Sequence, residues 1–252
     1  MREVRERALA LARQSNAPAL VIGERGSGRR MVARLIHEAS TRRDGAGLIF
    51  DGRGLPATLI LSELFGHIRR GFSGAYRDKL GLMWRAHGGS LILSDVHGLP
   101  TAVQIALDDF ISTGEVTPIG SAEAIGIVDV RLLATTDVPF ENSSGLGPFL
   151  QTFGWRLQSR LVVPPLRERP EDILELFDAF INGTHGDVPA PRLSPDAARL
   201  LMRYRWPGNI SELRELATRL LRADIRATIT ADDIARELAL NQLRDGRDLP
   251  SL

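Results

Sequence analysis

A short apolar run that leads straight into a glycine-rich turn constrains the fold of this chain most strongly. The run covers residues 17–22, the turn covers 23–28, and residues 29–39 then place apolar side chains at helical spacing. Such a run is typical of a buried parallel strand. A strand, a glycine turn and a helix in succession open a phosphate-binding unit, because the glycines let backbone N–H groups wrap a phosphate at the positive end of the helix. The segment therefore predicts an α/β fold with a phosphate site after its first strand.

Further apolar runs extend this unit into a sheet. Four more strands are predicted, with helical segments between them, at residues 48–50, 91–93, 128–134 and 161–163. Strands that alternate with helices favour a mainly parallel sheet with both faces covered. We therefore expect residues 1–169 to form one α/β domain.

The pattern changes after Pro170. Three segments there have helical spacing, and a fourth follows the capping residue Thr230: 171–180, 196–204, 210–222 and 230–240. No strand pattern is visible in this part of the sequence. We expect a small all-helical second domain over residues 170–240, followed by a frayed tail, 241–252, that is too short for a DNA-binding domain.

Composition excludes several classes of protein. Among 252 residues, 43% are apolar and 25% are charged, as in ordinary globular chains. The lack of cysteine excludes disulfides, thiolate catalysis and cysteine-ligated zinc, and the histidines show no metal-site spacing, so no metal site is expected. A net charge of +1 gives no case for direct DNA binding. No signal peptide or membrane-spanning run is visible, so we expect a cytoplasmic protein without a membrane partner.

Several longer strings are specific to one family. They are residues 23–40, SELFGH (62–67), GFSGA (71–75), GGSLIL (88–93), VRLLATT (130–136), PLRER (165–169) and WPGNI (206–210). Over residues 2–240, the chain resembles the AAA+ central domain of bacterial enhancer-binding proteins, the ATPases that activate sigma-54 RNA polymerase. The resemblance implies a P-loop AAA+ doubly wound parallel sheet with a small C-terminal all-helical lid. It also implies a ring, usually hexameric, with ATP between neighbouring subunits.

The resemblance assigns binding residues as well. Those that would hold ATP or ADP, with or without Mg²⁺, are Gly23, Glu24, Gly26, Ser27, Gly28, Arg29 and Arg30. The family's sigma-54 contact loop corresponds to residues 70–75, in which Arg70 replaces the first glycine of the family motif. We expect Phe72 and Ser73 to contact sigma-54 from the loop tip; the alternative is that Phe72 is merely a hydrophobic residue of a hairpin.

The central catalytic positions depart from the family. The P-loop lysine is Arg29 here, and a planar guanidinium does not replace a compact ammonium beside transferring phosphates. The family's Asp-Glu pair at the end of the third strand is Ser94-Asp95. The magnesium position thus carries a neutral oxygen, and the acid that orients the attacking water is one methylene shorter. In an alternative interpretation, Asp95 takes the magnesium role and leaves the base position empty.

Other positions around the phosphates also differ. Asp51 stands where an asparagine usually restrains the catalytic acid, and Asp137 occupies the sensor position. Of the family's two arginine fingers, the first aligns with Leu150, while the second is retained as Arg156. Such a finger is worth roughly 10³–10⁵ in rate. Ser211 stands in place of the lid arginine.

Together these changes predict a degenerate AAA+ domain, with Asp95 and Arg156 as the remaining catalytic candidates. We expect it to bind nucleotide, to hydrolyse it poorly and to act in transcriptional regulation through protein partners. The expected partners are sigma-54 RNA polymerase, another AAA+ activator, or both, in a homo- or hetero-oligomer with no direct DNA binding. The alternatives are a slow ATPase that activates sigma-54 RNA polymerase from solution without enhancer binding, a chain that binds no nucleotide, and a gene product without a selected role.

Overall fold

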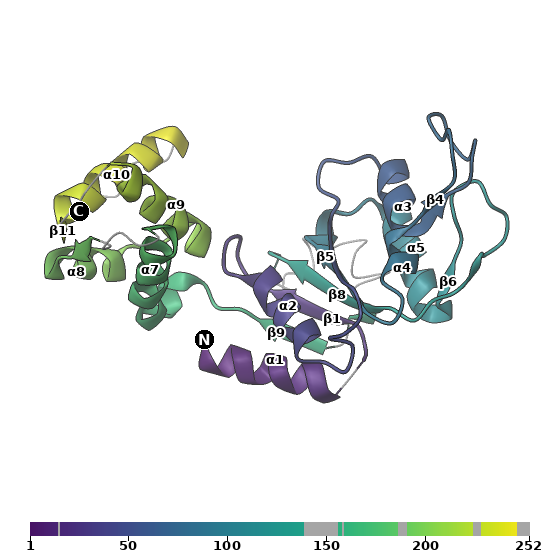
Figure 1. Cartoon of the computed structure of the whole chain (residues 1–252), viewed down its shortest axis with the longest axis horizontal. Coiled ribbons are helices and arrows are strands. Elements are labelled where there is room, and N and C mark those ends of the chain that lie inside the picture. The colour runs from purple at the N-terminus through teal and green to yellow at the C-terminus, as the bar shows by residue number, and fades with distance from the viewer. Residues whose placement is uncertain (15, 139–155, 158, 186–190, 224–227, 246–252) are drawn as a thin grey trace. The chain divides into compact units, whose positions relative to one another are not determined.

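The computed structural model describes residues 1–14, 16–138, 156–157, 159–185, 191–223 and 228–245 (Figure 1). Contacts divide the chain into two compact units. The N-terminal unit comprises residues 2–23 and 28–163, and the C-terminal unit comprises residues 24–27 and 164–252 together with Met1. This division falls six residues before the boundary expected from the sequence, and it groups the tip of the glycine turn with the second unit.

A five-stranded sheet forms the centre of the N-terminal unit (Figure 1). Its strands, in the spatial order β2-β5-β8-β1-β9, are β2 (Gly47–Asp51), β5 (Ser90–Ser94), β8 (Arg131–Thr136), β1 (Ala19–Ile22) and β9 (Ser159–Val162). Every neighbouring pair is parallel. The expected mainly parallel α/β sheet is thereby confirmed.

Helices cover the sheet and explain why its inner strands are apolar. Among its described residues, this unit contains the helices α1 (Arg2–Gln14), α2 (Arg29–Glu38), α3 (Ala57–Phe65), α4 (Leu82–Arg85) and α5 (Thr101–Thr113), with a 3₁₀ turn, η1, at Val96–Gly98. α2 contacts β1, β5 and β8, while α1 lies against α2 and β9. Leu91 and Leu93 of β5 share an apolar core with Leu107 and Phe110 of α5. Strands buried in this way read as continuous apolar runs.

Two short hairpins lie beside the sheet. One pairs β3 (Gly66–His67) with β4 (Lys79–Leu80), and the other pairs β6 (Glu115–Val116) with β7 (Gly126–Ile127). The Ile68 N–H donates to the Ile119 carbonyl, and the Ile119 N–H donates to the Gly66 carbonyl, at 3.1 and 3.0 Å. The fourth strand was expected over 128–134, but β8 begins at Arg131, because Val128 is hydrogen-bonded to Gly114 beside the second hairpin.

The C-terminal unit is built from helices around its own apolar core. They are α7 (Pro170–His185), α8 (Pro195–Arg203), α9 (Asn209–Arg222) and α10 (Ala231–Asp245), preceded by a 3₁₀ turn, η3, at Leu166–Glu168. Trp206 is fully buried in this core, and its indole Nε1 donates to the Leu201 carbonyl at 2.9 Å.

The C-terminal unit also contains strands that the sequence did not indicate. β10 (Arg192–Leu193) and β11 (Thr228–Ile229) form a parallel pair, so the expected all-helical lid carries a small sheet. Strands of two residues are too short to show alternation. α10 continues past the expected boundary at residue 240, and residues 246–252 of the predicted tail lie outside the described ranges. Within those ranges, no helix is both long and apolar enough to cross a bilayer.

The lid core gives a direct test of this architecture. Leu216 is fully buried in α9, whereas Leu240 in α10 is half exposed. We expect Leu216→Ala to lower the free energy of unfolding by about 2–5 kcal/mol, because it leaves a cavity in a packed core. The matched change Leu240→Ala should cost about 0.5 kcal/mol or less. Urea unfolding followed by circular dichroism measures both, and equal losses would contradict the described packing.

Candidate functional site

Parallel pairing brings the candidate residues to one edge of the sheet. In the register, Asp51 at the end of β2 pairs with Ser94 at the end of β5, and Ile22 of β1 pairs with Thr136 at the end of β8. The Gly23 N–H donates to the Thr136 carbonyl at 3.1 Å. In open α/β sheets, ligands bind outside the carboxyl ends of the strands. Asp51, Ser94 and the start of the glycine turn therefore lie at the edge where such folds bind ligands.

The start of α2 is built to attract negative charge. Gly28 precedes it with φ +100°, a conformation that favours glycine. The first amide groups of a helix have no acceptor within the helix, and they lie at the positive end of its dipole. α2 has no acidic residue in its first turn and begins with Arg29 and Arg30. Because two guanidinium groups lie at the positive end of the helix dipole, nearby anions are needed to compensate their charge.

Protein carboxylates supply those anions. Arg29 and Asp95 are both buried, with 8% and 6% of their side chains exposed, and Arg29 Nη2 lies 3.0 Å from Asp95 Oδ1. The other oxygen, Oδ2, lies 3.3 Å from Arg53 Nη1. Asp95 therefore faces two guanidinium groups. Its backbone is also unusual, with φ +50° in a non-glycine residue.

Arg53 links the ends of β2 and β5. Its Nε and Nη2 donate to the two oxygens of Asp51 at 2.9 and 2.7 Å, while Nη1 approaches Asp95. These hydrogen bonds hold the pKa of Asp51 below its ordinary value. Arg30 Nη2 adds a longer contact of 3.3 Å to Asp51. Sequence reasoning did not single out Arg53, since an arginine two residues beyond a strand belongs to no motif.

Ser94 and Asp137 occupy neighbouring positions. The Ser94 side chain is 2% exposed, and its Oγ has no hydrogen-bond partner among the residues that the structure describes. Asp137 Oδ1 lies 3.3 Å from His97 Nε2, and His97 Nδ1 lies 3.0 Å from Thr136 Oγ1. Asp137, which the sequence predicted at the sensor position, thus lies against an imidazole.

The tip of the glycine turn, residues 24–27, contacts other parts of the C-terminal unit. Glu24 accepts two hydrogen bonds from Arg167, at 2.8 and 2.6 Å, and these hold the pKa of Glu24 below its ordinary value. The Ile210 N–H donates to the Gly26 carbonyl at 2.9 Å, and Arg169 Nη2 donates to that of the buried Ser27 at 2.7 Å. The turn is therefore anchored through its backbone as well as its side chains.

Asn209 organises this anchor. It is fully buried with φ +54°. Its side-chain oxygen accepts from the Leu166 N–H at 2.7 Å, and its amide donates to the Arg25 carbonyl at 2.9 Å and to Glu24 at 3.1 Å. Neither Asn209 nor Arg167 was predicted as a site residue, although both lie within the family strings.

Arg156, which the sequence predicted as an arginine finger, is exposed and paired within its own unit. Arg156 Nε donates to Asp108 Oδ1 at 2.8 Å, and this hydrogen bond raises the pKa of Arg156. Nearly half of the Arg156 side chain is exposed. The position of the other finger, Leu150, lies outside the described residues.

The predicted contact loop joins β3 to β4. Phe72 is half-buried and packs edge-on against His67, with ring centroids 5.1 Å apart, whereas Ser73 is exposed. Tyr76 is 87% exposed, so it presents more aromatic surface than Phe72. Arg70, at the position of the family's first glycine, keeps a positive φ of +67°. The sequence reading missed Tyr76 because it lies just beyond the motif.

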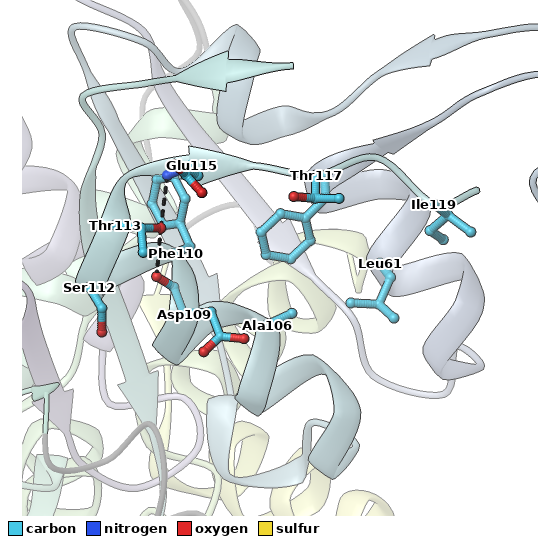
Figure 2. A pocket seen from close by; sticks show the side chains of 10 residues that line it. Leu61, Ala106, Asp109, Phe110, Ser112, Thr113, Glu115, Thr117 and Ile119 are labelled. Atoms are coloured by element: carbon cyan, nitrogen blue, oxygen red, sulfur yellow. Dashed lines mark hydrogen bonds between the residues drawn. The ribbon is translucent and has the colours of Figure 1, made fainter. Parts of the chain in front are cut away.

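A separate pocket of about 490 Å³ lies between α3, α5 and β6 (Figure 2). Phe65, Phe110 and Leu61 form its apolar lining, and the carboxylates of Asp109 and Glu115 border it. It contains none of the predicted site residues.

Two family models match the chain. Residues 1–162 match the sigma-54 interaction domain, and residues 167–249 match the AAA+ ATPase lid domain. Among solved structures, NtrX from Brucella abortus in complex with ATP is similar with a TM-score of 0.83 and 28% identity, over 97% of this chain and 57% of that one.

Curated relatives are bacterial regulators. The response regulator protein PilR of Pseudomonas aeruginosa is 41% identical over 222 residues, which are 87% of this chain and 49% of PilR. The sigma-54-dependent transcriptional regulator SfnR of Pseudomonas fluorescens is 38% identical, over 92% of this chain and 63% of SfnR. The DNA-binding transcriptional regulator NtrC of Bradyrhizobium is 36% identical, over 92% of this chain and 49% of NtrC. The chain spans about half to two thirds of these proteins, and they give no support to the expected lack of DNA binding.

The anchor of the glycine turn can be tested through Asn209. We expect Asn209→Ala to cost about 1–3 kcal/mol of stability, because it leaves buried backbone groups without partners. Arg167→Ala removes a more exposed ion pair to Glu24 and should cost at most about 1 kcal/mol. Urea unfolding and amide exchange at Leu166 measure the effect. Unchanged exchange at Leu166 in the Asn209 variant would contradict the assigned hydrogen bond.

Proposed function

Because the chain belongs to the family of sigma-54 interaction AAA+ domains, we propose that it binds a nucleotide, hydrolyses it poorly and regulates transcription through protein partners. Each part of this proposal rests on a different group of residues.

Nucleotide binding is supported by the turn and the helix that follows it. Gly26 and Gly28 both have positive φ, and the first amide groups of α2 have no acceptor within the helix, as at helix starts that bind a phosphate. Arg29 and Arg30 add positive charge at that point. The similar NtrX structure contains ATP, which favours ATP or ADP as the ligand here.

The buried Arg29–Asp95 ion pair carries the proposal of poor hydrolysis. Hydrolysis needs a carboxylate that orients the attacking water, and a misplacement near 1 Å can cost about 100-fold. Asp95 is the acid next to Ser94 at the strand end, but its oxygens face Arg29 and Arg53. A carboxylate turned toward two guanidinium groups is badly placed to orient a water molecule.

Arg156 can still serve another subunit. The contact between Arg156 and Asp108 is partly exposed, with 47% and 28% of the two side chains accessible, so exchanging it for a neighbour's phosphate requires no change in the core. We propose that Arg156 completes the ATP site of a competent AAA+ relative in a mixed assembly, while the site of this chain stays slow.

We propose that the loop between β3 and β4 contacts sigma-54. Phe72 supports the loop through His67, and the exposed Ser73 and Tyr76 supply the contact surface. Contact of this loop with sigma-54 is compatible with a chain that activates transcription and with one that antagonises it.

The slow ATPase remains the second candidate function, and it is favoured by the retention of Arg156. In that case slow ATP hydrolysis depends on the remaining residues Arg29, Asp95 and Arg156.

Turnover separates these two candidates. We expect the purified chain to hydrolyse ATP at least about 100-fold more slowly than a competent family member assayed beside it. In a mixture with that relative, Arg156→Ala in this chain should lower the turnover of the mixed assembly. If the chain alone hydrolyses ATP at a measurable rate, and Arg156→Ala lowers that rate, the slow ATPase is favoured instead.

Sigma-54 binding tests the loop. We expect Tyr76→Ala to weaken binding of purified sigma-54 by about tenfold, as for an aromatic contact residue, and Phe72→Ala to weaken it by about as much, because the loop loses its support on His67. Met31, exposed on α2 outside the loop, provides the control Met31→Ala, which should leave affinity unchanged. Biolayer interferometry gives the affinities. Equal affinities for all three variants and the unmodified chain would remove the loop from the proposal.

A further inference from the structure

The charged cluster at the strand ends does not suit a magnesium ion. Mg²⁺ requires oxygen ligands, usually one or two carboxylates together with the phosphates. Ser94 offers a neutral hydroxyl, and Asp95 has both oxygens within 3.3 Å of guanidinium nitrogens. A divalent cation beside Asp95 would be repelled by Arg29 and Arg53. Among the described residues, no group of three histidine or acidic side chains is placed to hold a metal ion.

The same cluster suits a phosphate better than a cation. Three guanidiniums, of Arg29, Arg30 and Arg53, contact two carboxylates, of Asp51 and Asp95. A third carboxylate, of Asp137, also attracts Arg53 but lies against His97. The contact of Arg29 with Asp95 places a carboxylate beside the first turn of α2, where a P-loop holds phosphate oxygens. Asp95 therefore stands in for the anion that the helix and the arginine attract.

Arg53 gives Asp95 a second partner. If a phosphate takes Arg29, Asp95 keeps its contact with Arg53, so its charge stays compensated. Removal of one partner from a buried ion pair is otherwise strongly unfavourable. Arg53 also remains bound to Asp51 by two hydrogen bonds, which fix its position.

From these contacts we infer that the site takes the phosphates of a nucleotide without a divalent cation, in exchange for Asp95 on Arg29. Arg53 is the positioning residue that retains the displaced carboxylate. This inference rests on the proposed nucleotide binding and specifies how it is regulated: Asp95 is an internal competitor of the ligand.

Calorimetric titration of the full chain with ATP and with ADP, in Mg²⁺ and in EDTA, tests the inference. For the unmodified chain we expect affinities in EDTA to equal those in Mg²⁺ within about twofold. Asp95→Asn should tighten binding by about tenfold, because Arg29 loses its competitor. Asparagine also tolerates the positive φ at this position. Arg53→Gln should weaken binding several-fold, and it should have a smaller effect in the Asp95→Asn background.

Two controls separate local from general charge effects. Asp129→Asn removes a carboxylate that pairs with Arg42 beyond the opposite ends of the strands, and Arg43→Gln removes an exposed arginine. Neither should change affinity. Circular dichroism verifies the fold of each variant, and the comparison of Mg²⁺ with EDTA needs no variant at all.

The outcomes are distinct. If Mg²⁺ tightens nucleotide binding tenfold or more, and Asp95→Asn abolishes this effect, then Asp95 acts on a bound metal ion. That result would overturn the inference but leave nucleotide binding intact. Absence of binding at millimolar ATP in both the unmodified chain and a folded Asp95→Asn variant would overturn nucleotide binding itself. Metal-independent binding that Asp95→Asn leaves unchanged would remove the competitor role.

Discussion

Parallel hydrogen bonding between β2, β5, β8 and β1 is the constraint on which the candidate site depends. The strands contribute little polar chemistry within their length, because their inner residues are buried and apolar. Their carboxyl ends must nevertheless meet at one edge, so residues distant in the sequence become neighbours. Asp51 and Asp95 reach the same guanidinium for this reason. Once two carboxylates and three arginines share that edge, their mutual neutralisation follows from Coulomb attraction in a partly buried place.

Much of the fold was predictable from the sequence, because its signals are local. The apolar runs and the glycine turn placed β1, α2, β5 and β9 within a few residues, and the helical spacing after Pro170 placed the helices of the second unit. The pair of β10 and β11 was not predictable, since two-residue strands leave no periodicity. The start of β8 was misplaced because Val128, just after β7, is hydrogen-bonded to Gly114 rather than paired in the sheet.

The candidate site was predictable in its positions but not in its contacts. Arg29, Asp95 and Asp51 could be identified from their motif positions, yet nothing in the sequence indicates that Arg53 joins them. That contact depends on the side-chain reach of one arginine in a loop after β2, and on the register that pairs Asp51 with Ser94. Likewise, the exposure of Tyr76 and the half-burial of Phe72 depend on how the loop packs on His67.

The glycine at position 26 has two separate reasons to be there. Its φ of +77° suits a turn around a phosphate, but a side chain at this position would also overlap the carbonyl oxygen of Gly208, whose neighbour Asn209 anchors the turn. A descendant that had given up nucleotide altogether would still be under selection to keep Gly26. A glycine-rich turn of this kind can therefore persist in a chain that no longer binds a nucleotide.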